Sequence, residues 1–328
     1  MYRFFVGIDV SKNVIDVAVK ETDQVQFFGQ FKNDHSGFKR MLKEICKITS
    51  CKSTQGFFCF ENTGTYSKSL LEFLISHQIS CREENPIQIK RSMGLKRGKN
   101  DQIDAKCICQ YAYEKRETIQ PSKLDKPLIV KLKCLLSRRD LLVKQKVALD
   151  LSVKERAPRL DLKLKELFLH QNESLLTLFR NQIKEIECEI GKTIRQDDDL
   201  RISNELIQSI KGIGPIIGAY LIAFTGNFSR FDDARKFACY CGIAPFPNQS
   251  GKFLGKTKVS HLANKKIKSL LSNAVPVAIR LDPQIQKYQK AKLNEGKARG
   301  IIVNNIKNKL IQRVFAVVKR QSPYVILQ

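Results

Sequence analysis

Two short apolar runs, each ended by a carboxylate, place the strongest constraint on how this chain folds. Residues 4–8 (Phe-Phe-Val-Gly-Ile) lead to Asp9, and residues 56–60 (Gly-Phe-Phe-Cys-Phe) lead to Glu61. Runs this short and this apolar are typical of strands buried on both faces of a sheet. The acids at their ends are best explained if a cation lies between them and an anionic partner.

The first 120 residues alternate between strand-like and helix-like patterns, which predicts an α/β domain over residues 1–120. Three β-branched and aromatic segments predict a meander, followed by helix, strand, helix, strand and helix. In chain order, these expected elements cover residues 4–10, 14–20, 25–31, 38–46, 56–61, 70–75, 79–82 and 87–93.

Residues 121–200 change to two long helical stretches punctuated by prolines. In the second stretch, apolar residues recur at alternating steps of three and four, as in a coiled-coil seam. The residues of this seam are Leu169, Leu176, Phe179, Ile183, Ile186 and Ile190. The pattern fits either a helical hairpin packed on itself or an arm that binds a second copy, and both remain open.

Residues 201–328 form the third expected domain, which is mainly helical. Two helical patterns flank Gly212-Ile213-Gly214, and this predicts a helix-hairpin-helix whose backbone amides hold a phosphate. The alternative is a tight corner between two helices that uses its glycines for packing alone. Lys211, Gly212 and Gly214 are therefore candidate nucleic-acid contacts.

Charge identifies the class of partner. The chain carries 58 Lys and Arg against 32 Asp and Glu, a net charge of +26, which favours a phosphate backbone as its partner. Residues 251–328 alone hold 17 basic and two acidic residues, a net +15. An apolar helical face indicates that this region folds rather than forming a tail, and its residues are Ile301, Ile302, Val303, Ile306 and Leu310.

Other features exclude some classes of protein. The ten cysteines form no C-x2-C pair of the kind found in zinc sites, and most are expected to be reduced core residues. No stretch approaches the ~20 apolar residues that a membrane span needs. We therefore expect a cytoplasmic protein with no membrane partner.

A second pair of acids completes a candidate site. Asp101 and Asp104 are three residues apart at the start of a predicted helix, so they share one face of its first turn. Together with Asp9 and Glu61 they offer four oxygen donors, which suit two hard ions such as Mg²⁺ or Mn²⁺. The basic residues just before the pair are placed to meet a phosphate strand: Lys96, Arg97 and Lys99. Taken singly, each acid also fits a turn or a helix start.

Four segments together resemble a known family. They are residues 7–12 (GIDVSK), 61–66 (ENTGTY), 99–105 (KNDQIDA) and the block from Gly212 to Pro245. In order and spacing they resemble the DEDD transposases of insertion-sequence family one-hundred-and-ten, the bridge-RNA-guided recombinases. Several separate motifs in one chain are more specific than one acidic pair.

The resemblance implies a RuvC-like RNase H fold for residues 1–120, with Asp9, Glu61, Asp101 and Asp104 as the metal-binding tetrad. It also implies a helical coiled-coil arm over residues 121–200 and a transposase domain over residues 201–328. In the family, a serine in a Ser-Gly loop attacks a DNA phosphate beside the metal site of a partner subunit. The matching residue here is Ser250.

The implied partners are donor DNA, target DNA, a bridge RNA and further copies of the chain, as a homodimer that forms a tetramer on DNA. Basic residues around and after the serine loop are candidate phosphate contacts: Lys252, Lys256, Lys258, Lys265, Lys266 and Lys268. Two alternatives remain. One is a RuvC-like structure-specific nuclease that uses the carboxylates and water, and the other is a non-catalytic nucleic-acid scaffold.

Overall fold

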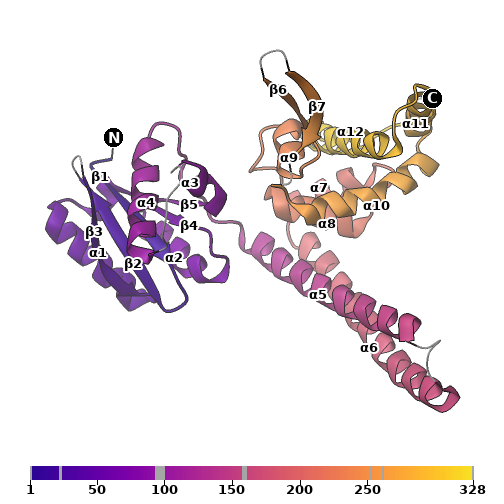
Figure 1. Cartoon of the computed structure of the whole chain (residues 1–328), viewed down its shortest axis with the longest axis horizontal. Coiled ribbons are helices and arrows are strands. Elements are labelled where there is room, and N and C mark those ends of the chain that lie inside the picture. The colour runs from indigo at the N-terminus through magenta and orange to yellow at the C-terminus, as the bar shows by residue number, and fades with distance from the viewer. Residues whose placement is uncertain are drawn as a thin grey trace. The chain divides into compact units, whose positions relative to one another are not determined.

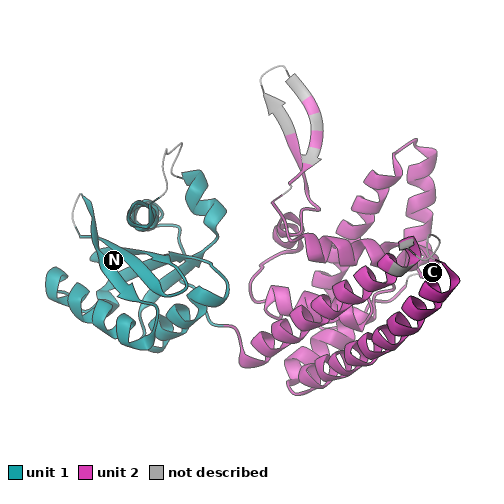
Figure 2. Ribbon diagram, turned by 60° about the horizontal axis from the view of Figure 1, so that its bottom comes forward, with its two compact units in different colours: residues 1–124 teal, residues 125–328 magenta. Residues whose placement is uncertain are grey.

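The computed structural model describes residues 2–21, 24–92, 100–156, 161–250, 253–260 and 262–326. The chain forms two compact units, Met1–Leu124 and Asp125–Gln328, which are coloured separately in Figure 2. The first unit combines a sheet with helices and the second is mostly helical (Figure 1). This confirms the expected change from an α/β part to a mainly helical part, whereas a further division near residue 200 stays a prediction.

A five-stranded sheet forms the centre of the first unit, in the order β3-β2-β1-β4-β5. Strands β1 to β3 form the predicted antiparallel meander, and β4 and β5 run parallel to β1. This topology is consistent with the RNase H-like fold that the resemblance implies. The strands are β1 Phe4–Val10, β2 Val14–Lys20, β3 Val25–Lys32, β4 Gly56–Glu61 and β5 Ser80–Glu84.

Helices cover both faces of this sheet. Alternate residues of a strand point to opposite faces, so Phe4 and Phe5 enter two different cores. Phe4 packs with residues of α1 and α2, and Phe5 packs with residues of α4. The helices are α1 His35–Thr49, α2 Thr65–Ser76, α3 Pro86–Ser92 and α4 Asp101–Glu114, with a short 3-10 turn at Ser53–Gln55.

Two long helices begin the second unit. Helices α5 (Pro127–Arg156) and α6 (Leu162–Arg195) run side by side as a hairpin, which we call the arm (Figure 1). Leu176 and Ile190 of the predicted seam are buried, so the hairpin does pack on itself, but Leu169 is exposed. Further out, the arm exposes other large apolar side chains: Leu141, Val147, Leu151, Leu162, Leu164, Leu167, Phe168, Leu175 and Leu178. Binding of a second copy stays a prediction.

The remaining helices of the second unit share one core. Tyr220, Phe237, Leu271 and Leu310 are buried in it, so the basic C-terminal region is folded, as the sequence predicts. Ile301, which was assigned to the apolar face of that region, is exposed instead. The elements are α7 Asp198–Gln208, α8 Pro215–Thr225, α9 Ala234–Tyr240, β6 Pro245–Ser250, β7 Phe253–Val259, α10 Lys265–Leu281, α11 Pro283–Asn294 and α12 Arg299–Arg320.

Two compositional expectations can be compared with the structure. All ten cysteines carry free thiols, but only five are buried, and Cys134 and Cys188 of the arm are exposed. Four of the five buried cysteines belong to the first unit, so the expected core role holds mainly there. Among the helices of the described ranges, none is both long and apolar enough to cross a membrane.

Candidate active site

Asp9 and Glu61 lie at the ends of neighbouring parallel strands. Ile8 of β1 pairs with Phe60 of β4, and each acid follows directly. Two and four residues earlier, Cys59 and Phe5 pack in the core beneath α4, so strand alternation places both acids on the same face as α4. The sheet therefore brings together two acids that are 52 positions apart in the sequence, as the strand patterns predict.

A close approach between β1 and α4 positions the second pair of acids. A Cβ built on Gly7 would lie 2.1 Å from Cys109 N and 2.4 Å from Ala105 O, so only glycine lets the helix lie this near the strand. The Asn100 side chain caps the helix by accepting a hydrogen bond from Gln102 N at 3.0 Å. The first turn of α4, which carries Asp101 and Asp104, is thereby set beside the end of β1.

Three of the four expected acids form a cluster. One carboxylate oxygen from each of Asp9, Asp101 and Asp104 lies within 4.8 Å of the other two. Glu61 is not part of this cluster of three, but its charge acts on Asp9. Hard divalent cations prefer carboxylate oxygens, and this donor set fits one such ion directly.

The pKa of Asp9 shows how unfavourable its negative charge is without a cation. Burial raises the pKa of Asp9 from 3.8 to about 6, and the charges of Asp101, Asp104, Glu61 and Asp16 add to the increase. Like charges this close disfavour ionisation of the buried member. A divalent cation among them would reverse that effect, so the cluster fits Mg²⁺ or Mn²⁺.

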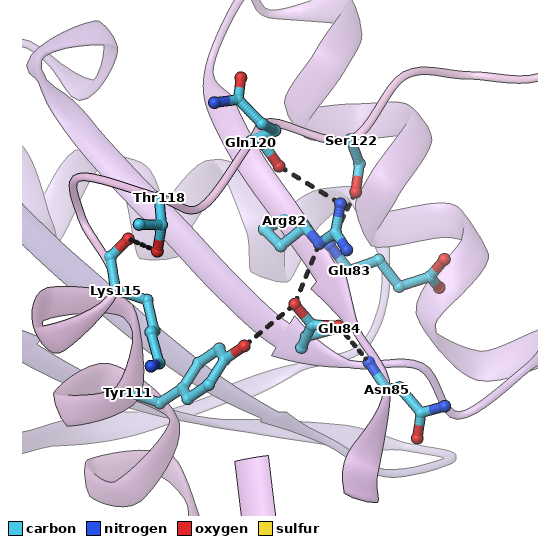
Figure 3. A network of polar contacts seen from close by, with 9 residues as sticks. All are labelled: Arg82, Glu83, Glu84, Asn85, Tyr111, Lys115, Thr118, Gln120 and Ser122. Atoms are coloured by element: carbon cyan, nitrogen blue, oxygen red, sulfur yellow. Dashed lines mark hydrogen bonds and ion pairs between the residues drawn. The ribbon is translucent and has the colours of Figure 1, made fainter. Parts of the chain in front are cut away.

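A buried acid on the edge strand β5, Glu84, links that strand to α4 (Figure 3). Glu84 is 7% exposed and is the register partner of Glu61 on β5. Its carboxylate accepts hydrogen bonds from Tyr111 Oη at 3.2 Å, Arg82 Nε at 3.2 Å and Asn85 N at 2.9 Å. Glu84 is thus already well supplied with donors, and we assign it a positioning role.

The segment after α4 is fastened to the edge of β5 (Figure 3). Ser122 N donates to Cys81 O at 2.7 Å, and Glu83 N donates to Ser122 Oγ at 2.9 Å. Arg82 Nη1 also donates to Gln120 O at 3.4 Å while its Nε holds Glu84. Arg82 therefore connects the segment that leaves the first unit to Glu84.

Sequence reasoning missed Asp16, the other acid beside the cluster. Asp16 is 3% exposed and pairs across the sheet with Asp9, on the same face. It accepts hydrogen bonds from Gln30 Nε2 at 3.1 Å on both oxygens. An acid between apolar residues of a strand, as in Ile15-Asp16-Val17, was the signal that could have identified it.

Several expected site residues lie outside the described part of the structure. Ser250 is the last residue of β6, and its side chain is not described. The same holds for the side chains of Lys256 and Lys258, and for these whole residues: Lys96, Arg97, Lys99 and Lys252. The expected contact between Ser250 and DNA, and those of the basic residues, remain predictions.

The described phosphate-contact candidates differ in their surroundings. Lys211 and Lys265 are exposed, whereas the Lys266 ammonium pairs with Asp140 of α5. Gly212 has a φ of +98° and lies against α10, where a Cβ would come 2.7 Å from Ala274 O. Close packing thus gives one reason for a glycine at 212, whereas a Cβ on Gly214, just before α8, would meet nothing within 4 Å. Whether either backbone contacts a phosphate stays a prediction.

Two family descriptions match separate parts of the chain. Residues 6–155 match a family of DEDD transposases of the IS110 type, and residues 204–290 match a family described as "Transposase IS116/IS110/IS902 family". The first match covers the carboxylate cluster and most of α5. The second covers the helices around Gly212 and the β6–β7 ribbon.

Similar proteins include two that span nearly the whole chain. The pilin gene-inverting protein of Moraxella bovis is 27% identical over 99% of this chain and 98% of its own length, and that of Moraxella lacunata is 26% identical over the same shares. An uncharacterized protein of insertion element IS116 from Streptomyces clavuligerus is 31% identical over 35% of this chain and 28% of its own length.

Proposed function

The chain belongs to the IS116/IS110/IS902 family of transposases, and from this membership we propose that it cuts and rejoins DNA with a metal-binding carboxylate site and a serine nucleophile. The observation that carries this proposal is the convergence of Asp9, Asp101 and Asp104 from a strand and a helix far apart in sequence. Carboxylates whose oxygens lie within 4.8 Å of one another repel each other, and a bound divalent cation would offset that repulsion.

Each acid has a role in this proposal. Asp9, Asp101 and Asp104 hold Mg²⁺ or Mn²⁺, and Glu61 completes the tetrad from the neighbouring strand. The bound metal supplies charge stabilisation for the attacking and leaving oxygens of phosphoryl transfer. Glu84 and Asp16 do not touch DNA, but they orient the sheet end and α4 around the tetrad.

Ser250 is the proposed nucleophile. A serine hydroxyl attacks a phosphate only after its proton is removed or its charge is stabilised. Its position at the tip-side end of β6 supports presentation to a partner subunit's carboxylate site, which makes the active centre a composite of two copies. The Ser250 oxygen forms a bond to phosphorus, and the displaced DNA oxygen leaves with a proton as a free hydroxyl.

The finer domain assignments are part of the same proposal. We assign residues 1–120 to a RuvC-like RNase H domain, residues 121–200 to a coiled-coil arm, and residues 201–328 to a transposase domain with a helix-hairpin-helix. The protein acts in the cytoplasm as a homodimer that assembles into a tetramer on DNA. The exposed apolar side chains of the arm support contact with a second copy.

Target choice is proposed to rest on a bridge RNA. Base pairing by an RNA explains a large excess of phosphate-binding charge without a zinc site that reads bases. The DNA that flanks the coding region should contain a structured noncoding segment complementary to the element ends and the target. Its absence would remove RNA guidance from the proposal and leave the cutting chemistry in place.

A covalent adduct is the decisive test. The full-length protein is incubated with donor and target DNA and Mg²⁺, and protein-linked DNA is detected by its sensitivity to protease. Ser250→Ala should abolish the adduct, and Asp104→Asn should abolish adduct and cutting together. Ser174→Ala serves as a control, because the hydroxyl of Ser174 is exposed and donates only to His170 O of its own helix.

The same experiment separates the alternatives. Normal cutting by Ser250→Ala, with no adduct in the wild type, would identify a RuvC-like nuclease that uses water. Unchanged cutting and metal affinity in Asp9→Asn and Asp104→Asn would instead indicate a scaffold whose acids have no catalytic role.

A second candidate function is DNA inversion. Near full-length similarity to two pilin gene-inverting proteins favours it, because inversion also requires paired cutting and rejoining. A plasmid with two recombination sites in opposite orientation distinguishes inversion from transposition. Inverted junctions amplified from it would support inversion, and insertion at a new target with no inverted junctions would support transposition alone.

A further inference from the structure

Lys307 is a buried basic residue in the most basic part of the chain. Its side chain is 7% exposed, although it lies on α12 in a helix that otherwise buries apolar residues. Within the described ranges its ammonium has no hydrogen-bond acceptor and no carboxylate partner. Buried lysines are rare unless they are paired, because desolvation of an ammonium is costly.

The nearest charge to Lys307 is another lysine. Burial lowers the pKa of Lys307, and the positive charge of Lys268 on α10 lowers it further. Lys268 Nζ donates to Gly242 O at 2.9 Å, so it is also held in a fixed position. Repulsion between the two positive charges raises the cost of folding, and an anion bound near both would offset it.

The two lysines lie at the foot of the β6–β7 ribbon. Asn304, one turn before Lys307 on α12, donates from Nδ2 to Ile243 O at 2.8 Å, next to the carbonyl that Lys268 holds. A Cβ on Gly242 would lie 2.9 Å from Ser260 O, so this turn packs against the residue that follows β7. Lys268 and Lys307 therefore converge where the ribbon that carries Ser250 leaves the helical core.

Within the described residues 262–326, both acids are already paired with other cations. Residues 251–328 contain only Asp282 and Glu295 as acids. Arg313 Nη1 lies 2.6 Å from Asp282, and Lys292 Nζ lies 2.6 Å from Glu295. The neighbouring Lys266 forms an ion pair with Asp140 of α5. No carboxylate of this region is thus left for Lys268 and Lys307, and a bound phosphate could supply the counter-charge.

We propose that Lys268 and Lys307 form a phosphodiester-binding site at the foot of the β6–β7 ribbon. The site rests on the proposed function only in taking nucleic acid as the ligand. A phosphate between the two ammonium groups gains two charge-assisted hydrogen bonds and removes their mutual repulsion. Bound there, the strand is anchored to α10 and α12 beside the ribbon, which fixes the approach of Ser250 to DNA.

The test measures nucleic-acid affinity of the full-length protein over a series of salt concentrations. One probe is duplex DNA and the other is an RNA hairpin, because either can supply the phosphodiester. Lys307→Met removes the charge and keeps a long apolar stem. Lys319→Met is the matched control, since Lys319 is exposed near the end of the same helix.

Lys307→Met is expected to weaken binding about tenfold, whereas Lys319→Met changes it much less. The slope of log Kd against log salt should become shallower by about 0.9 with duplex DNA. With the RNA hairpin it should become shallower as well if RNA supplies the phosphate. A loss confined to DNA or to RNA identifies the source of the phosphate. Lys268→Met should reproduce the loss, so the test does not depend on one variant.

Thermal stability without nucleic acid gives an independent readout. Removal of an unpaired buried charge should leave the midpoint of Lys307→Met equal to or above that of the wild type. A clear fall in midpoint would assign Lys307 a structural role and overturn the proposal. Wild-type binding with an unchanged salt slope in Lys307→Met and Lys268→Met would overturn this site alone, whereas a wild type that binds neither probe would overturn the proposed function as well.

Discussion

Gly7 of β1 lies in contact with Ala105 of α4, where a Cβ on the glycine would stand 2.4 Å from the Ala105 carbonyl oxygen. This contact sets the depth at which α4 crosses the sheet. Because Asp104 directly precedes Ala105 and Asp9 lies two residues beyond Gly7, the same contact determines the distance between the two acids. Backbone packing and the geometry of the cluster are therefore coupled.

Gly7→Ala tests this coupling between backbone packing and the geometry of the acidic cluster. The added methyl group forces α4 away from β1 and costs about 1–3 kcal/mol of unfolding free energy. Mn²⁺ affinity, measured by calorimetry, should fall even in molecules that remain folded. Gly29→Ala is the control, since a Cβ at Gly29 meets nothing closer than 3.6 Å. Wild-type Mn²⁺ affinity in Gly7→Ala would refute this coupling.

The parts of the fold that could be predicted are those that a local sequence pattern specifies. The strand boundaries of β1 and β2 were predicted to the residue, because runs of Phe, Val and Ile bounded by polar turns specify them. That Asp9 and Glu61 could meet depended on their strands being neighbours in the sheet, and the pairing of β1 with β4 meets that condition. For α4, the sequence predicted a helix with two acids on one face, but not its close approach to β1.

What could not be predicted depends on contacts between distant elements. Glu84 takes its role from the register of β5 and from Tyr111, which lies 27 residues later in the chain. The burial of Lys307 depends on how α12 packs against α10, and nothing in its local sequence indicates it. The contact of Gly212 with Ala274 of α10 likewise joins distant elements, and the expected phosphate contact of Gly212 stays a prediction.

The stability of the metal-free protein should depend on pH through Asp9. Its pKa is raised from 3.8 in the unfolded chain to about 6, so the folded state binds the proton more tightly. Stability from this group is full below about pH 4 and is lost as pH rises through about 6. In a chelator, Asp9→Asn should raise the thermal midpoint above about pH 6 and remove this dependence.

Metal should reverse the effect, because Mn²⁺ or Mg²⁺ binds the ionised form. Added metal should raise the wild-type midpoint above about pH 6, less so at about pH 5, and not raise that of Asp9→Asn. Glu72→Gln, which removes an exposed acid on α2, should respond as the wild type does. A midpoint of Asp9→Asn below the wild type in chelator would show that the Asp9 charge stabilises the fold.

Tyr111→Phe tests the positioning role of Glu84. The change removes the donor at 3.2 Å from Glu84 and leaves Arg82 and Asn85 N in place. We expect a loss of about 1 kcal/mol in unfolding free energy. The Mg²⁺ concentration for half-maximal DNA cutting should rise, while DNA affinity stays unchanged. Tyr113→Phe is the control, because it keeps the ring contacts with Phe5 and Arg116 and should behave as the wild type. If both variants need the same Mg²⁺ concentration for half-maximal cutting, Tyr111 has a structural role only.

The exposed leucines of the arm should determine the oligomeric state. Leu175 and Leu178 are 46% and 52% exposed on one stretch of α6, where solvent exposure of large apolar side chains is unfavourable unless a partner covers them. Leu175→Glu with Leu178→Glu should convert a dimer into a monomer in light-scattering measurements, with the helix content kept. Asn181→Glu adds a charge at an exposed polar position of the same helix and should leave the dimer intact. If the proposed composite site uses Ser250 of a partner subunit, the double variant should also lose the DNA adduct while it still binds Mn²⁺. A dimer that survives the double change would place the subunit interface elsewhere.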